Sequence, residues 1–153
     1  MWGEISMDLY YLSQIVAQKK QFDALYRKAG ARFGMSECTM WVLYFLISSD
    51  ELITQQDLIE KMLFPKQTIN SAVVKLEKEG YVNLHTIPTA GNRKIIMLTQ
   101  KGRDLTNETV RRLLRAELLA VHNMGSERIS QFIQLYTELF DAMRKEFVKE
   151  ELH

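Results

Sequence analysis

The sequence contains few of the residues that cross-link small secreted proteins or interrupt helices. Cys38 is the one cysteine among 153 residues, so no internal disulfide can form. Two prolines and seven glycines leave long stretches free to be helical. The amino-terminal segment "MWGEISMDLYY" has neither the basic start nor the apolar core of a signal peptide. These absences argue against a disulfide scaffold and predict a cytoplasmic protein.

Long apolar runs are also missing. The most apolar uncharged stretch, residues 38–49, is about a dozen residues, whereas a membrane-spanning helix needs about 20. We therefore expect no membrane partner and interpret this stretch as a buried helix. With 46% hydrophobic residues the chain can build one well-packed core, so residues 1–153 are predicted to form a single, mainly α domain.

The signatures of common enzymes are absent as well. There is no G-x-S-x-G, no phosphate-binding glycine loop and no H-E-x-x-H. His85 and His122 are far apart in the sequence, and the chain offers only one cysteine as a further ligand. This spacing is poor for a zinc site. We expect no catalytic activity, no metal and no cofactor.

Charge is distributed unevenly along the chain. The formal net charge is only +1, which by itself gives no argument for an anionic partner. Residues 65–115, however, carry ten basic side chains against four acidic ones, a net charge of +6. A partner with negative charge is therefore to be sought against this segment.

The first half of the chain predicts three helices. Apolar residues at helical spacing indicate a long helix over residues 5–29, which Gly30 would end. Ser36 is typical of the start of a second helix. Thr54, with Asp57 three residues later, predicts the start of a short helix that runs through Met62.

A fourth helix is predicted between Pro65 and Gly80. Proline suits the start of a helix and glycine its end. Its apolar face is formed by Ile69, Ala72, Val73 and Leu76. The opposite face gathers polar side chains without a carboxylate: Lys66, Gln67, Asn70, Ser71 and Lys78.

After Gly80 the apolar period changes from helical to two. The runs "YVNLHTI" and "KIIML" flank the turn "PTAGNR", which predicts a two-stranded hairpin with a basic tip. Thr99 then caps a further helix through residues 103–121, and "NMGS" at 123–126 breaks it. A broad apolar stripe over 129–147 predicts the last helix.

Two short helices followed by a basic hairpin are the layout of a winged helix-turn-helix, here over residues 36–99. The major groove of DNA admits one helix, whose amides, hydroxyls and small apolar groups contact base edges. The candidates for base contacts are Gln67, Asn70, Ser71 and Val74. The candidates for phosphate or minor-groove contacts are Lys66, Thr68, Lys75, Lys78, Arg93 and Lys94.

The segment "ITQQDLIEKMLFPKQTINSAVVKLEKEGYV", followed by "GNRKIIMLTQKG", resembles the MarR family of bacterial winged-helix regulators. The resemblance implies a homodimer formed by helices within residues 1–30 and 104–153. It also implies a repressor that binds a pseudo-palindromic operator in double-stranded DNA and is released by a small aromatic or anionic effector. Residues that could line an effector pocket are Tyr10, Tyr11, Trp41 and Tyr44.

The sequence departs from the family pattern in three places. The wing segment "AGNRK" supplies Arg93 without the aspartate that usually stands near it. Pro65 replaces the serine that often caps the recognition helix. Some relatives sense peroxide through a cysteine in the first helix, where this chain has Tyr10 and Tyr11, while Cys38 falls in the second helix.

Simpler readings of the same residues stay open. The polar face of residues 66–78 can be a solvated helix surface, as can "RRLLR" at 111–115. The four aromatic residues, together with Phe45, are expected to be core, and Cys38 to be a small buried hydrophobic residue. The rival function is a helical scaffold whose apolar stripes bind another protein, and it differs from a DNA reader in being insensitive to salt.

Overall fold

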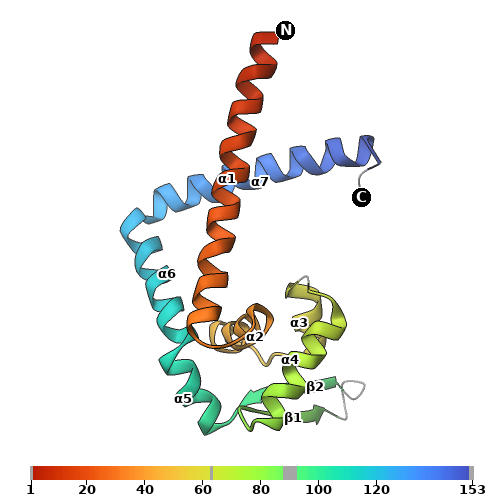
Figure 1. The fold of residues 1–153 in the computed structure, drawn as a ribbon, viewed down its shortest axis with the longest axis vertical. Helices are drawn as coiled ribbons and strands as arrows, with labels where there is room; N and C mark the ends of the chain where they lie inside the picture. The colour runs from red at the N-terminus through yellow and green to blue at the C-terminus, as the bar shows by residue number, and fades with distance from the viewer. Residues whose placement is uncertain (1, 63, 88–92, 152–153) are drawn as a thin grey trace. The chain divides into compact units, whose positions relative to one another are not determined.

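The computed structural model describes residues 2–62, 64–87 and 93–151 (Figure 1). It is mainly helical with one small sheet, as predicted. The chain divides into two compact units, Met1–Leu113 and Leu114–His153, and each is described by itself. The expected single domain over residues 1–153 stays a prediction. The elements are α1 (Trp2–Arg32), α2 (Glu37–Ser48), α3 (Gln55–Met62), α4 (Lys66–Lys78), β1 (Val82–Ile87), β2 (Arg93–Leu98), α5 (Gln100–Glu108), α6 (Val110–Met124) and α7 (Ser126–Lys149).

The end of α1 differs from the prediction. Gly30 does not stop the helix, which continues to Arg32. Gly30 is buried, and a Cβ placed on it would lie 3.4 Å from the Met35 carbonyl oxygen, at ordinary contact with the returning chain. Gly34, with φ of 68°, adopts the left-handed conformation that ends helices. From the sequence either glycine could end the helix. The structure shows that Gly34 does so and that Gly30 stays helical.

The predicted starts of α2 and α3 are confirmed. The Ser36 hydroxyl accepts a hydrogen bond from the Thr39 N–H at 3.1 Å. At the start of α3 the Asp57 carboxylate accepts from the Thr54 N–H at 2.7 Å, and the Thr54 hydroxyl accepts from the Asp57 N–H at 3.2 Å. This reciprocal pair satisfies backbone donors that a helix start leaves without partners.

Helix α4 begins and ends where the sequence predicts. Pro65 stands at its N-cap and makes no side-chain capping hydrogen bond, while its carbonyl accepts from Ile69 at 3.2 Å. Gly80, with φ of 76°, ends the helix. The four apolar residues of its predicted inner face are all buried: Ile69, Ala72, Val73 and Leu76.

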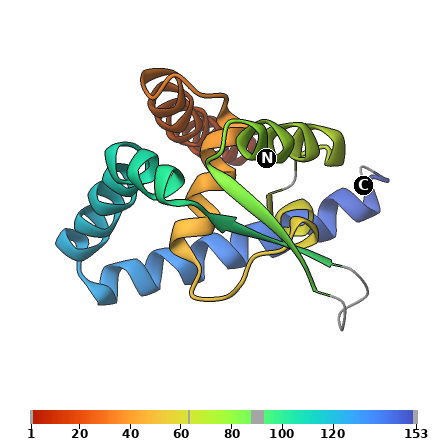
Figure 2. The same ribbon diagram turned by 90° about the horizontal axis from the view of Figure 1, so that it is seen from below.

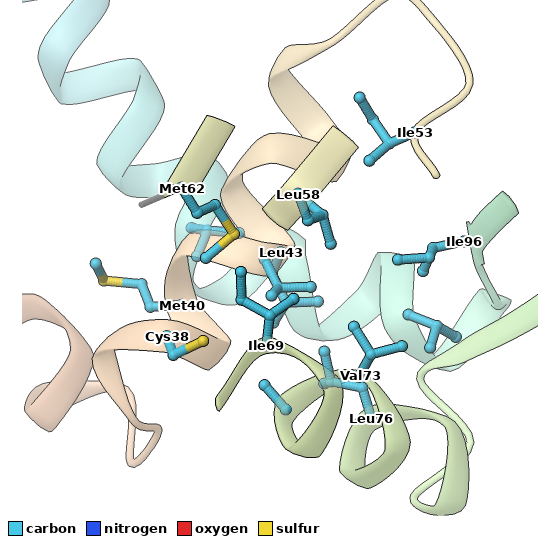
Figure 3. Close-up of a cluster of buried hydrophobic side chains, with 14 residues drawn as sticks. Cys38, Met40, Leu43, Ile53, Leu58, Met62, Ile69, Val73, Leu76 and Ile96 are labelled. Carbon is cyan, nitrogen blue, oxygen red and sulfur yellow. The ribbon is translucent and has the colours of Figure 1, made fainter. Parts of the chain in front are cut away.

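The core of the first unit lies among α2, α3 and α4. Leu43, Leu58, Ile69 and Val73 are completely inaccessible to solvent and converge from these three helices (Figure 3). Burying each such side chain contributes roughly 1.5–3 kcal/mol. The core therefore fixes α3 and α4 relative to each other, and with them the polar face of α4.

The predicted hairpin is present and gains a third partner. Strands β1 and β2 pair antiparallel from Val82 opposite Leu98 to Ile87 opposite Arg93. Figure 2 shows them side by side, with the chain passing from β2 into α5. The Ile53 carbonyl accepts from the Ile96 N–H at 2.9 Å, which joins the start of α3 to β2. The predicted turn at 88–92 lies outside the described residues.

A network of hydrogen bonds joins the end of α4 to the start of α5. Thr99 caps α5 as predicted, accepting from the Gly102 N–H at 3.0 Å, and its own hydroxyl donates to the Gly80 carbonyl at 2.7 Å. The Thr99 N–H donates to the Tyr81 carbonyl at 3.0 Å. A Cβ on Gly102 would collide with that same carbonyl oxygen. The segment "LTQKG" is therefore the place where the hairpin closes onto the following helix.

One predicted helix is in fact two. The expected continuous helix through residues 103–121 breaks at Thr109, whose φ of −124° and ψ of −99° are not helical. The Thr109 hydroxyl donates to the Leu105 carbonyl at 2.6 Å, and its N–H turns to the Thr106 carbonyl at 3.3 Å. A threonine side chain here takes the acceptor that the helix backbone would have used, so α5 ends and α6 begins.

The last helix begins after the predicted break. Gly125, with φ of 83°, precedes Ser126, the first residue of α7. No described residue of α7 is buried, so its apolar stripe is open within the second unit. None of the helices in the described part of the chain is both long enough and apolar enough to span a membrane.

Candidate nucleic-acid interface

The predicted base-reading face of α4 is accessible. Gln67, Ser71 and Val74 are exposed, and Val74 keeps 57% of its surface open although it is apolar. Asn70 is half-buried at the edge of this face. An exposed valine among amides and hydroxyls offers a methyl contact beside hydrogen-bonding groups, the combination that suits the major groove.

Acidic groups are confined to the last turn of α4. No acidic residue occurs between residues 66 and 76, while Glu77 and Glu79 follow and are exposed. Lys75 Nζ lies 4.0 Å from the Glu79 carboxylate, so this acid partly neutralises the positive charge of Lys75. The expectation of a face without a carboxylate therefore holds for the first three turns, which carry the candidate base contacts.

Basic residues from α4 and the wing lie around one open cleft. The cleft has a volume of about 370 Å³ and is lined by Thr54, Gln55, Gln56, Ile59, Lys66, Asn70, Arg93 and Lys94. Lys66 comes from the start of α4, whereas Arg93 and Lys94 begin β2. None of the lining residues is acidic. The structure thus brings together four of the predicted DNA contacts from two elements that are separated in sequence.

The wing arginine also acts on a carboxylate of α3. The hydrogen bonds from the Thr54 hydroxyl and N–H hold the pKa of Asp57 below its ordinary value, with smaller contributions from the positive charges of Lys61 and Arg93. The wing lacks the aspartate that is usual in the resembling family.

Gln55 was not among the predicted site residues. Its Nε2 donates to Asn70 Oδ1 at 2.6 Å and links the first turn of α3 to α4. The available signal was local, because "TQQD" places a glutamine directly after the Thr54 cap. Its partner lies fifteen residues away, however, and sequence spacing does not reveal such a contact.

Two of the predicted effector-pocket residues are separated from the other two. Trp41 packs between Tyr26 and Tyr44, with ring centroids 4.7 Å and 5.2 Å away. Tyr10 and Tyr11 instead pack against each other and are each 56% exposed, so the expectation that they are core is wrong. Tyr10 precedes Tyr26 by sixteen residues of α1, about 24 Å along the helix. Within one chain these four aromatic residues do not form one pocket.

Cys38 is buried, as predicted. Burial raises the pKa of its thiol, and the negative charge of Glu37 raises it further. A thiol in this state is a poor nucleophile. Within the described residues no group of three histidine, cysteine or acidic side chains is arranged to hold a metal ion.

Solved structures share the arrangement of this chain. A MarR family regulator from Neisseria meningitidis, NMB1585, aligns with a TM-score of 0.75 over 92% of this chain and 98% of its own, at 18% identity. MarR from Oenococcus oeni PSU-1 aligns with a TM-score of 0.62 over 87% and 98%, at 13% identity. MepR of S. aureus, in a complex with DNA, aligns with a TM-score of 0.62 over 88% and 95%, at 17% identity. At these identities the likeness establishes the fold.

The sequence carries a family likeness of its own. Residues 33–91, which run from the end of α1 through both helices of the helix-turn-helix to the wing, match the sequence profile of the MarR family. The matched segment covers the helix-turn-helix and part of the hairpin, so the likeness to the MarR family lies in the winged helix. Members of this family are transcription regulators and not enzymes. No curated protein matches the sequence significantly.

The fold is a winged helix, in which α4 occupies the position called the recognition helix and β1–β2 form the wing. The cleft between α4 and β2 is then the junction of recognition helix and wing.

Proposed function

We propose that this protein represses transcription by binding a pseudo-palindromic operator as a homodimer, and that a small aromatic or anionic effector releases it. The observation that carries the proposal is the cleft shared by recognition helix and wing. Its three cations, Lys66, Arg93 and Lys94, lie beside an exposed face that is free of acids over residues 66–76. A helix face that contacts only solvent would tolerate acidic and basic side chains together, so the absence of acids beside these cations favours an anionic partner.

The centre of the recognition helix would contact bases. Gln67 and Ser71 offer hydrogen-bonding groups one turn apart, and Val74 offers methyl groups to a thymine. The Ser71 hydroxyl donates to the Gln67 carbonyl at 2.9 Å, which leaves its oxygen free to accept from a base. We assign these residues, with Asn70, to sequence recognition.

The borders of the same face would contact the DNA backbone. Lys66, Arg93 and Lys94 are exposed around the cleft. The further candidates on α4 are Thr68, Lys75 and Lys78, which are exposed as well. Each lysine or arginine that neutralises a phosphate releases counterions, so these residues make binding depend on salt without specifying sequence.

Exposed apolar helix surfaces support the homodimer. On α1 the exposed fractions of Leu9, Phe22 and Leu25 are 64%, 58% and 64%. On α7 those of Phe132 and Tyr136 are 58% and 53%. Isolated apolar side chains are common on protein surfaces, but stripes along whole helices are not, and a second copy of the chain would cover them.

A second open cleft in the first unit suits the effector. It has a volume of about 310 Å³, and its walls include Ile47, Ile53 and Ile96 together with Arg103 and Arg111. The lining also includes Glu51, so apolar walls with two guanidinium groups and one carboxylate remain net positive and fit a small aromatic anion. The Arg103 guanidinium donates to the Leu98 carbonyl at 2.8 Å, so Arg111 is the group that we assign to the anion.

The decisive experiment is selection from a random duplex pool, followed by fluorescence-anisotropy titration of the winners at several salt concentrations. We expect a palindromic site bound with a Kd of roughly 10 nM or tighter and a steep salt dependence. In Lys66→Ala the magnitude of the logarithmic salt slope should fall by about 2, because a dimer loses one phosphate contact in each half-site. The matched control is Lys19→Ala, since Lys19 is an exposed lysine of α1 that pairs with Asp23.

The rival scaffold function makes the opposite prediction. A protein-binding scaffold would enrich no sequence and would bind DNA weakly, if at all, with equal behaviour in Lys66→Ala and Lys19→Ala. Light scattering tests the dimer separately, and a monomer mass at micromolar concentration would contradict it. Binding of salicylate-like aromatic acids that Arg111→Ala abolishes would support the effector site.

A further inference from the structure

The side chain that links the two helices of the helix-turn-helix has no role in the function proposed so far. Gln55 Nε2 donates to Asn70 Oδ1 at 2.6 Å, and both residues are partly buried in the wall of the cleft between recognition helix and wing. The bond joins α3 to α4 at the point where Lys66 and the wing cations surround the opening. It is a contact between side chains, so it fixes the orientation of an amide without being needed for either helix.

The bond determines which end of the Asn70 amide faces outward. An asparagine side chain carries an acceptor oxygen and a donor NH2 on opposite sides of one planar group. Because Gln55 holds the oxygen against α3, Nδ2 is the end turned away from that helix. Among the residues that the structure describes, none accepts a hydrogen bond from Asn70 Nδ2. Asn70 therefore offers a donor to whatever approaches the recognition helix.

We propose that Gln55 is a specificity-determining residue that, by orienting Asn70, makes it read an acceptor on a base edge, a purine N7 or guanine O6. The inference rests on the proposed DNA-binding function and deepens it. A freely rotating asparagine would favour adenine, using oxygen and NH2 together. An asparagine whose oxygen is held by Gln55 reads with its NH2 and rejects cytosine, whose major-groove edge is a donor.

The neighbouring glutamine provides the matched control. Gln56 also lies in the first turn of α3 and lines the same cleft, but its Nε2 donates to Glu60 of its own helix at 2.9 Å. Removing Gln56 takes away an amide of the same size from the same surface and leaves Asn70 held. A general effect of truncating a side chain of α3 would thus appear in both Gln55→Ala and Gln56→Ala. An effect that acts through Asn70 would appear in Gln55→Ala alone.

The test measures base preference at each operator position for the wild type and the variants. Asn70→Ala should lose about tenfold of discrimination at one base pair in each half-site. Gln55→Ala should lose discrimination at the same pair, and the double variant should lose no more there than Asn70→Ala. Gln56→Ala should keep the wild-type preference.

A reversal of the base preference would show that Gln55 orients the Asn70 amide and does not simply support the fold. In Gln55→Glu the carboxylate cannot donate, so Asn70 should turn its NH2 toward α3 and expose its oxygen. The preferred base should then change to cytosine, whose N4 is a donor and which the wild type rejects, whereas adenine carries an acceptor and a donor and does not distinguish the two orientations. The added negative charge will weaken binding to all sequences, so the preference is compared within each variant. Circular dichroism on heating should show all variants folded as the wild type is.

Failure of the inference and failure of the proposed function give different results. If the wild type selects no sequence, the proposed function fails and this inference with it. If the wild type selects an operator but Gln55→Ala keeps every base preference, or loses it at a pair that Asn70→Ala does not affect, the inference alone is overturned. Selection of a cytosine opposite Asn70 by the wild type would overturn it as well.

Discussion

The close approach of α5 to the end of the wing predicts a large effect for a small substitution, Gly102→Ala. The added Cβ would collide with the Tyr81 carbonyl oxygen and lie 3.1 Å from a methyl carbon of Leu98. Both the carbonyl and α5 belong to the backbone, so neither can move aside as a flexible side chain does. The start of α5 must shift, and the 3.0 Å hydrogen bond from the Thr99 N–H to Tyr81 shifts with it.

The expected magnitude follows from three contributions. Overpacking at a rigid site costs about 1–3 kcal/mol. Weakening a hydrogen bond costs about 1 kcal/mol. Alanine favours a helix over glycine by up to about 1 kcal/mol, which acts in the opposite direction. The free energy of unfolding should therefore fall by about 2 kcal/mol, which lowers the Tm of a chain of this size by roughly 4–8 °C.

The assay is thermal unfolding followed by circular dichroism, with all proteins at one concentration because an oligomer's stability depends on it. Gly30→Ala is the control, since Gly30 is also a helical glycine and its added Cβ would meet the Met35 oxygen at 3.4 Å, an ordinary contact. It should keep or slightly raise the Tm. A Tm of Gly102→Ala at or above that of the wild type would refute the reasoning.

Three further predictions concern residues away from the candidate base contacts. Hydrogen bonds from Thr54 hold the pKa of Asp57 below its ordinary value, so the ionised carboxylate stabilises the fold at pH values above the ordinary aspartate pKa. This stabilisation is lost as the pH falls through the lowered pKa. The difference in Tm between wild type and Asp57→Asn should therefore shrink between about pH 6 and pH 3. Cys38 should react with iodoacetamide slowly in the native protein and rapidly in urea, and fast native labelling would contradict its burial. Lys101 donates to a carbonyl at the end of α4 at 2.7 Å and lies over the Tyr81 ring, so Lys101→Met should lower the free energy of unfolding by about 1 kcal/mol in the same thermal assay.

The site was predicted in part. The exposed face of α4 and the wing cations were found because a helical period separates buried from exposed positions without knowledge of the fold. The coupling of Gln55 to Asn70 was missed, since it depends on how two helices cross. The expectation that Tyr10 and Tyr11 belong to the core was wrong, because an aromatic residue on a long helix can lie beyond the part of the helix that packs on the core. The effector pocket that would join them to Trp41 and Tyr44 stays a prediction.

What the sequence determined by itself is local. The caps at Ser36, Thr54 and Thr99, the proline start and glycine end of α4, and the period-two strands each depend on groups within about one turn of the chain. These signals suffice for a winged helix. The tertiary structure decided the rest, because a glycine or threonine suits several local conformations and its neighbours in space select among them. Gly30 stays helical although its place in the sequence suits a helix end, and Gly102 is a glycine because a carbonyl oxygen lies where its side chain would be.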